Sequence, residues 1–321
     1  MATTEHPLAA AYDALTRRCG LVDRSERGKL LLTGPEAKEF LHGQVTNEVE
    51  ALVEGTGCYA AFLTHKGKML GDMRVLDGGD AGLWLDCERP ALQELFNMIR
   101  RYKLGRDVEV HKRTLERALL SLVGPDARRV AGATDLLDGE HAHRLATVGG
   151  ATVRLVTTDV GVDVIADAQD ADAVREALVA AGAETAGEDA AEVVRVQSGR
   201  PRFGIDLEPE AVIPQEAGLN ARAVSFEKGC YVGQETVARL HWRGKPNRHL
   251  RGLRLSEPVV AGTALTTAEG KVVGRVTSPV VSPALGPIAL ALVRREVAPG
   301  EPVSAGDGGA TARVVELPFQ L

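Results

Sequence analysis

The densest group of reactive side chains lies between Lys228 and Glu235, where the sequence reads K-G-C-Y-V-G-Q-E. Its two glycines allow the backbone to approach a ligand closely, because glycine has no Cβ atom. A thiol, an amine, an amide and a carboxylate are crowded around them. With Lys228 nearby, Cys230 is a candidate redox or nucleophilic group. The alternative is a small buried cysteine at a tight turn, since free cysteines are commonly buried.

A basic run follows this segment. From Arg239 to Arg251 the sequence contains five Arg or Lys residues and two His residues, without an acidic residue. In an acidic chain such a run indicates a local anion site, and its alternative is a solvated hinge. Arg239 follows Gln234 and Glu235 by about one helical turn, so we expect these three side chains to share a pocket.

Two more polar side chains lie next to predicted turns. A helix predicted over residues 188–197 ends before Ser198-Gly199, which places Gln197 in its last turn. The Gln197 amide offers a paired donor and acceptor to the edge of a heterocycle, or else it faces water. Asp72 and Arg74 follow a predicted hairpin turn, where an ordinary surface ion pair is the alternative. The doublet His141 and His143 lacks a third metal ligand, so no metal site is predicted.

The elements that must position these residues are mixed. Strands at 58–63 and 69–76 flank a turn, and a third at 83–87 continues them as an antiparallel meander. Further strands are predicted at 29–33, 107–111, 118–123, 152–157 and 161–166, and helices at 36–42, 90–102, 170–181 and 188–197. The helices are too irregularly placed for a doubly wound parallel sheet, so the pattern indicates an α+β fold.

The pattern of predicted secondary structure changes near residue 250. Short strands separated by Gly and Pro turns are predicted at 250–255, 264–267, 271–277, 288–293, 302–304 and 311–317. This spacing is typical of a small β-barrel. Residues 241–247 carry turn formers and are the predicted hinge before it.

Composition excludes several classes of protein. The 321 residues are 44% hydrophobic and 26% charged, which is typical of a globular protein. A net charge of -6 argues against a surface built for nucleic acid or anionic membranes. The four widely spaced cysteines and the absence of a signal-like N-terminus predict a cytoplasmic protein. Three prolines interrupt the longest nearly uncharged stretch, residues 276–293, so no membrane span is predicted.

Taken together, these segments resemble the YgfZ family of folate-binding proteins. Its members are relatives of the glycine-cleavage T protein (aminomethyltransferase) that take part in iron-sulfur cluster assembly or repair. The most specific match is Lys228 to Glu235, which fits the family signature K-G-C-Y-x-G-Q-E. Other matching segments lie at residues 32–37, 40–47, 200–206, 213–216 and 274–278.

The resemblance implies a T-protein-like folate-binding region of two interleaved α+β subdomains at residues 1–245, and a C-terminal β-barrel domain at residues 246–321. Tetrahydrofolate or a derivative is the implied ligand, and no permanently bound metal is predicted. Cys230 is the implied functional thiol. The side chains expected at the folate are Gln197, Lys228, Tyr231, Gln234, Glu235 and Arg239.

Two positions depart from the transferase relatives. Where T proteins carry paired aspartates, this sequence has Gly71-Asp72, and their pterin-gripping glutamate falls at Gln197. These departures favour an accessory factor over an enzyme. Such a factor would bind tetrahydrofolate and support assembly or repair of iron-sulfur proteins, including tRNA-modifying enzymes. The alternative is a folate-dependent aminomethyltransferase or demethylase acting on a small amine, with Asp72 as its catalytic acid. RNA binding through Arg239–Arg251 is disfavoured by net acidity and by the lack of clustered aromatic residues.

Overall fold

The computed structural model describes residues 7–306 and 309–320, which form two compact units. The first unit contains the described residues up to Leu63, together with Leu70–Ala191 and Arg222–Val232. The second contains Thr64–Met69, Glu192–Ala221 and the described residues from Gly233 onward. The division of the chain between residues 245 and 246 stays a prediction.

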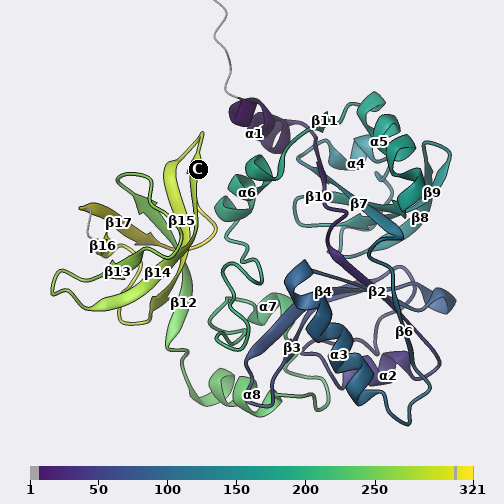
Figure 1. Ribbon diagram of the computed structural model, residues 1–321, viewed down its shortest axis with the longest axis horizontal. Coiled ribbons are helices and arrows are strands. Elements are labelled where there is room, and N and C mark those ends of the chain that lie inside the picture. The colour runs from purple at the N-terminus through teal and green to yellow at the C-terminus, as the bar shows by residue number, and fades with distance from the viewer. Residues whose placement is uncertain (1–6, 307–308, 321) are drawn as a thin grey trace, which may run out of the picture. The chain divides into compact units, whose positions relative to one another are not determined.

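Two β-sheets build the first unit (Figure 1). The six-stranded sheet has the order β11-β1-β7-β10-β9-β8. Its strands are β1 (Gly20–Asp23), β7 (Arg117–Val123), β8 (His143–Val148), β9 (Ala151–Thr157), β10 (Gly161–Asp167) and β11 (Glu184–Thr185). The five-stranded sheet has the order β3-β4-β5-β2-β6. Its strands are β2 (Gly28–Thr33), β3 (Gly57–Leu63), β4 (Met69–Asp77), β5 (Leu83–Cys87) and β6 (Glu109–Lys112).

The two sheets are interleaved along the chain. The chain contributes β1 to the six-stranded sheet, leaves to build the whole five-stranded sheet, and then returns with β7 to β11. β1 pairs antiparallel with β7 and parallel with β11. This arrangement confirms the predicted pair of interleaved α+β subdomains, and the order β3-β4-β5 confirms the predicted meander.

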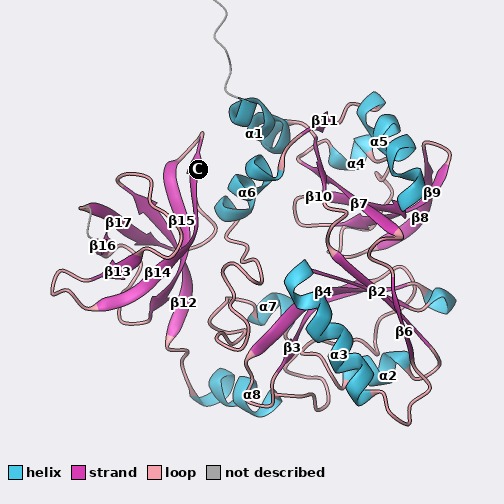
Figure 2. Cartoon of the chain, viewed as in Figure 1, coloured by secondary structure: helices cyan, strands magenta, loops and turns pink. Residues whose placement is uncertain are grey.

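Helices fall between the strands (Figure 2). They are α1 (Pro7–Arg17), α2 (Ala37–His42), α3 (Leu92–Tyr102), α4 (Ala127–Val130), α5 (Ala171–Ala180), α6 (Glu188–Gln197), α7 (Asn220–Ala223) and α8 (Gln234–Arg243), with short 3-10 turns at Gly79–Ala81, Arg89–Ala91 and Ala168–Asp170. The predicted helices near residues 36–42, 90–102, 170–181 and 188–197 are present. α1, α4, α7 and α8 were not expected, and α8 extends into the first residues of the predicted hinge at 241–247.

One face of the six-stranded sheet is apolar and packs against α4 and α5. From β10 this core takes Val162, Val164 and Ala166. Burying one such aliphatic side chain contributes about 1.5–3 kcal/mol. Because side chains alternate along a strand, Asp163, Ile165 and Asp167 project from the opposite face. The sheet therefore has one face that stabilises the unit and one that carries polar groups.

A closed β-barrel with the strand order β12-β15-β14-β13-β16-β17 makes up most of the second unit. Its strands are β12 (Arg248–Leu255), β13 (Ala264–Thr266), β14 (Val272–Ser282), β15 (Gly286–Arg294), β16 (Pro302–Ala305) and β17 (Ala310–Val315). The predicted barrel is confirmed. β14 is longer than expected, because a register shift between Val276 and Ser278 lets it continue through Pro279 against β15 alone.

The segment after α6 is attached to the barrel by buried polar contacts within the second unit. Arg195 Nη1 lies 2.8 Å from Asp206 Oδ2, and the Ser278 hydroxyl donates to Asp206 Oδ1 at 2.7 Å. Arg195 Nη2 also donates to Ser278 Oγ at 2.7 Å. Asp206 is 1% exposed, and its negative charge is therefore compensated by a cation and hydroxyl donors.

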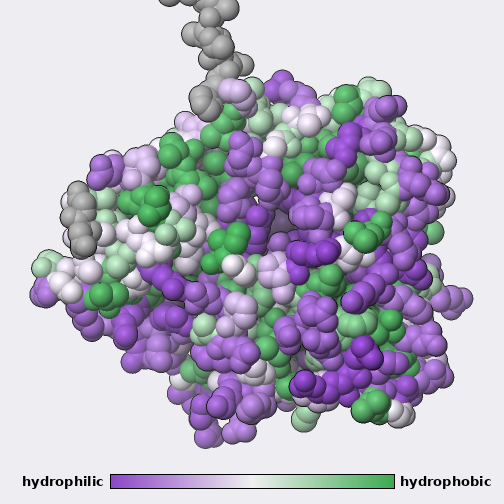
Figure 3. Space-filling view, viewed as in Figure 1, coloured by the Kyte–Doolittle hydropathy of each residue, from purple (hydrophilic) through white to green (hydrophobic). Residues whose placement is uncertain are grey.

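Hydrophobic residues are interspersed with hydrophilic ones over the face that Figure 3 shows. Within residues 7–306 and 309–320, no helix has the length and apolar character needed to cross a membrane.

Candidate functional site

Asp72 of β4 is a buried carboxylate with one oxygen left open. Its side chain accepts a hydrogen bond from the Tyr59 hydroxyl of β3, while its Oδ2 atom has no hydrogen-bond partner. Asp72 is 3% exposed, and burial raises the pKa of its carboxyl to about 6 although the Tyr59 hydrogen bond lowers it. At neutral pH Asp72 is mostly ionised, so Oδ2 is a strong hydrogen-bond acceptor without a donor.

The Tyr59 ring joins Asp72 to two residues from distant parts of the chain. The guanidinium of Arg222 lies 4.5 Å from the ring centroid, and the ring of His141 stacks at a centroid distance of 6.4 Å. Arg222 is itself held by Glu140, whose Oε1 and Oε2 lie 3.1 Å and 3.2 Å from Arg222 Nε. The cation over the Tyr59 ring is thereby fixed in place.

His141 is a second buried group with open polar atoms. It is 5% exposed, it has a φ of 71°, and neither ring nitrogen has a hydrogen-bond partner. Burial, followed by the charge of Arg74, lowers its pKa to about 4, so the ring is neutral at physiological pH. Its Nε2 atom lies 3.6 Å from Glu140 Oε1, too far for a hydrogen bond. Asp72, Tyr59, His141 and Arg222 together form what we call the Asp72 site.

A network of compensated buried charges joins Arg74 of β4 to Asp86 of β5 and Asp163 of β10. Arg27 Nε lies 2.7 Å from Asp86 Oδ1, and Arg74, which also pairs with Asp86, places Nη1 2.7 Å from Asp163 Oδ2. Burial raises the pKa of Asp86, but the charges of Arg27 and Arg74 outweigh it and hold the value at about 2. Interpreting Asp72 and Arg74 as a surface ion pair was wrong, because both are buried and Arg74 pairs with other aspartates.

The structure also explains why a second acid is missing beside Asp72. A Cβ atom at Gly71 would lie 2.4 Å from Phe62 Cε1 and 2.8 Å from the Cβ of Ala91. Such distances are far below van der Waals contact. The space that a second carboxylate side chain would need is therefore filled by the ring of Phe62.

The K-G-C segment is tied down through its lysine. Lys228 Nζ donates to the backbone carbonyls of His42, Val45 and Asn47, the last two at 2.7 Å and 3.1 Å. Burial lowers the pKa of Lys228 to about 8. Since an ammonium group has three protons, these carbonyls account for all of them. Lys228 therefore serves as a clamp on residues 42–47, and its ammonium also lies 5.0 Å from the centroid of the Tyr231 ring.

Cys230 differs from the other cysteines in its exposure. It is exposed, whereas Cys19 and Cys87 are buried and Cys58 is half-buried. Burial raises the pKa of Cys19 to about 11 and that of Cys58 to about 12, and it raises that of Cys87 further. Thiols with such raised pKa values are inert at neutral pH. Cys230 is the exposed thiol of the described chain.

The remaining predicted residues belong to the second unit. Gln197 is buried, and its Nε2 donates to Ser282 Oγ of β14 at 3.0 Å. Glu235 and Arg239 are exposed one turn apart on α8, which begins at Gln234 after Gly233, whose φ is 84°. The structure thus places Asp72, Lys228, Cys230 and Tyr231 in the first unit. The second unit contains the other four predicted residues, Gln197, Gln234, Glu235 and Arg239.

Around Asp72, sequence reasoning missed Tyr59, Glu140 and Arg222, and it considered His141 only as a metal ligand. Tyr59 could have been found, because it lies on the predicted hairpin strand beside that of Asp72. Glu140, His141 and Arg222 are far away in sequence, and no local pattern links them to Asp72.

A further group has metal-ligand chemistry. Of the residues that the structure describes, His42, Glu48 and Glu50 offer ligand atoms within 4.8 Å of one another. The Lys228 ammonium is bound to the carbonyl of His42, and this positive charge opposes binding of a cation there.

The two interleaved sheets with their helices and the C-terminal barrel define the class of protein, because both parts match domains of glycine-cleavage T proteins. Residues 2–228 match the GCVT N-terminal domain, and residues 248–320 match the glycine cleavage T-protein C-terminal barrel domain. The chain belongs to this glycine-cleavage T-protein family.

Relatives of this chain include transferases. It is 31% identical over 323 residues to an aminomethyltransferase of Rubrobacter xylanophilus, with 97% of this chain and 86% of that protein covered. It is 32% identical over 280 residues to the chloroplastic "Putative transferase" of Arabidopsis thaliana, where 84% of this chain spans 63% of the relative's length. The fold matches the crystal structure of glycine cleavage system aminomethyltransferase T from Bartonella henselae with a TM-score of 0.86 and 24% identity, covering 98% of this chain and 89% of that one.

Proposed function

We propose that this protein is a YgfZ-type member of the family: a cytoplasmic factor that binds tetrahydrofolate or a derivative and supports assembly or repair of iron-sulfur proteins, including tRNA-modifying enzymes. The observation that carries the proposal is the exposed thiol of Cys230 in the segment that Lys228 clamps. Iron-sulfur clusters are held by thiolates, so an exposed thiol on a fixed loop is a suitable group to meet a client's iron or cluster.

The Asp72 site supports the folate part of the proposal. Tetrahydrofolate carries one-carbon units when it is bound, and its pterin ring and amine nitrogens present N–H donors. The open Oδ2 atom of Asp72 is an acceptor of the kind that such a donor requires. An ionised acceptor adds to the strength of the hydrogen bond. These residues therefore fit a folate or an amine.

Complementation tests the role of the thiol. A strain that lacks this protein would be supplied with the wild-type chain, with Cys230→Ala, or with Cys58→Ala as a control for losing a half-buried thiol. We expect wild type and Cys58→Ala to restore the activities of iron-sulfur enzymes, and Cys230→Ala to fail at equal protein levels. Full restoration by Cys230→Ala would remove the thiol from the function.

Calorimetric titration tests the folate site. Wild type, Asp72→Asn and Gln197→Ala would be titrated with tetrahydrofolate and 5-formyltetrahydrofolate under reducing conditions. Losing a charged hydrogen-bond partner costs about 1.5–3 kcal/mol, so Asp72→Asn should weaken binding roughly tenfold or more. Gln197→Ala tests whether the predicted pterin contact exists. If wild type binds neither folate, the folate part of the proposal is wrong.

A folate-dependent aminomethyltransferase or demethylase is the second candidate, and the ionised, open carboxylate of Asp72 favours it. An amine substrate is a cation that such an acceptor binds well. Formation of methylenetetrahydrofolate from small aminomethyl donors, or of methyltetrahydrofolate from small methylated donors, abolished in Asp72→Asn, would support this function. Absence of turnover across the panel, with folate binding intact, would leave the accessory role.

A further inference from the structure

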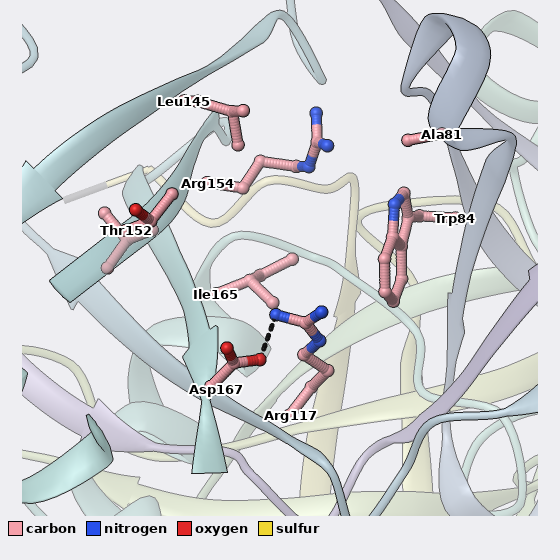
Figure 4. Close-up of a pocket in the computed structure, with 9 residues that line it drawn as sticks. Ala81, Trp84, Arg117, Leu145, Thr152, Arg154, Ile165 and Asp167 are labelled. Atoms are coloured by element: carbon pink, nitrogen blue, oxygen red, sulfur yellow. Dashed lines mark ion pairs between the residues drawn. The ribbon is translucent and has the colours of Figure 1, made fainter. Parts of the chain in front are cut away.

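A pocket of ≈ 310 Å³ lies against the polar face of the six-stranded sheet, within the first unit. Arg117, Arg154, Ile165 and Asp167 project into it from neighbouring strands, and Trp84 of β5 faces them (Figure 4). Leu145 adds to its apolar wall. Asp72, Cys230 and the other predicted site residues do not line this pocket.

The pocket contains more positive than negative charge. Arg117 pairs with Asp167, and its guanidinium lies 5.1 Å from the centroid of the Trp84 ring. Among the described residues Arg154 forms no ion pair; burial lowers its pKa, and the carboxylate of Glu54, whose charge raises that pKa, does not line the pocket. Two cations and one anion therefore line the pocket, which leaves one positive charge for a ligand.

His143 holds Arg154 without neutralising it. Burial, followed by the charge of Arg154, lowers the pKa of His143 to about 4, so its ring is neutral. The Nε2 atom lies 3.2 Å from the carbonyl oxygen of Thr56, which can only accept a hydrogen bond. Nε2 therefore carries the proton, and Nδ1 accepts from Arg154 Nη1 at 2.7 Å. This hydrogen bond fixes the orientation of the Arg154 guanidinium, in the way that neighbouring residues commonly fix a side chain that contacts a ligand.

Two buried donors at the pocket have no acceptor. They are the indole Nε1 of Trp84 and the Nε of Arg117. A buried donor without a partner costs about 1–3 kcal/mol, so a ligand oxygen that meets these groups gains the same amount. The open groups of the pocket are thus donors, next to the apolar side chains of Ile165 and Leu145.

From this arrangement we infer that the pocket binds a small monocarboxylate with an apolar or aromatic body. The carboxylate accepts hydrogen bonds from Arg154, Arg117 and the Trp84 indole, since guanidinium groups match carboxylate geometry. The body of the ligand lies against Ile165 and Leu145. The single surplus charge favours a monoanion over phosphate, and the volume is at the lower end of the range for small-molecule sites.

The chain offers a direct reporter for this binding. Its two tryptophans are Trp84 and Trp242, and Trp242 is 70% exposed on α8. The full-length Trp242→Phe variant therefore leaves Trp84 as the single fluorophore. We would titrate it with phenylacetate, with the neutral phenylacetamide and with inorganic phosphate, and repeat each titration by calorimetry.

We expect a saturable change in Trp84 emission with phenylacetate and much weaker binding of phenylacetamide. Arg154→Gln in the same background should raise the Kd for phenylacetate about ten- to hundredfold. The control is Arg175→Gln, which removes a guanidinium that pairs with Asp23 on the exposed surface of the same unit, and it should leave the Kd unchanged.

Equal binding of acid and amide, an unchanged Kd in Arg154→Gln, or the absence of saturation at millimolar phenylacetate would each overturn the inference. Binding of phosphate in preference to phenylacetate would replace it by an inorganic anion site. If Arg154→Gln does not fold, as judged by circular dichroism, the comparison of acid with amide on the parent chain decides. The test uses no folate, so its outcome is separate from that of the proposed function.

Discussion

Asp72 and Asp86 lie on neighbouring strands of one sheet and are about equally buried, at 3% and 5% exposure, yet their surroundings differ. Asp86 meets two guanidinium groups, and its pKa is held at about 2. Asp72 has one hydroxyl donor and an open oxygen, and its pKa is about 6. The fold therefore compensates the buried charge of Asp86 with two cations, whereas it leaves one oxygen of Asp72 without a hydrogen-bond partner.

The hydrogen-bond partners of the two carboxylates distinguish a residue that stabilises the fold from one that is available to a ligand. A compensated carboxylate stabilises the unit through its partners, whereas an open one is retained at a cost, which is typical of a site that acts on a ligand. Four substitutions test whether the two carboxylates differ in this way.

Removing a guanidinium from the compensated network should have the largest effect. Arg74→Ala leaves Asp86 and Asp163 buried with fewer cations, and breaking a buried pair in this way costs about 3–5 kcal/mol. Urea denaturation monitored by circular dichroism measures the loss. A cost below about 1 kcal/mol, the value typical of surface pairs, would show that the network is not compensated as described.

Neutralising the carboxylate of Asp72 should increase the stability of the fold above pH 6, the opposite of the effect of Arg74→Ala. The folded-state pKa of Asp72, about 6, lies above the ordinary aspartate value of 3.8, so its ionisation costs stability as pH rises through this window. The cost is absent below pH 3.8 and reaches at most about 3 kcal/mol above pH 6. Relative to wild type, Asp72→Asn should therefore gain stability between pH 4 and pH 7. A stability difference that does not change with pH would contradict the raised pKa.

Adding a side chain next to Asp72 should destabilise the fold. Gly71→Ala places a Cβ against the Phe62 ring, and overpacking of this kind costs about 1–3 kcal/mol. Phe62→Leu in the same chain should recover part of the loss by opening space. Thermal unfolding of the single and double variants measures both effects, and strict additivity of the two changes would argue against direct contact.

Removing the one donor of Asp72 should have the smallest effect. Tyr59→Phe deletes the hydroxyl that favours the ionised carboxylate, at a cost of about 1 kcal/mol. The pKa of Asp72 should rise further, which can be followed by NMR titration of the carboxyl carbon. A fall in the pKa would mean that the hydroxyl does not donate to the carboxylate.

Much of the fold could be predicted from the sequence, because strand signals are local. The apolar alternation around β10 and the Gly and Pro turns of the barrel are determined by neighbouring residues. The Asp72 site was only partly predictable. Asp72 follows a recognisable hairpin, but Arg222 reaches Tyr59 through tertiary packing that leaves no sequence pattern. Arg74 was misread for the same reason, since its partners Asp86 and Asp163 lie on other strands.

The interleaving of the two sheets has a consequence for synthesis on the ribosome. β1 is made before any of its partners, because it pairs with β7, which begins at Arg117, and with β11, which begins at Glu184. The five-stranded sheet, in contrast, is complete once Lys112 has left the exit tunnel. β1 can therefore pair only after β7 has been made, and β7 follows the last strand of the five-stranded sheet along the chain. Leu21 and Val22 of β1, which are buried in the folded unit, lack their partners until then, and transiently exposed apolar surface of this kind is what chaperones protect.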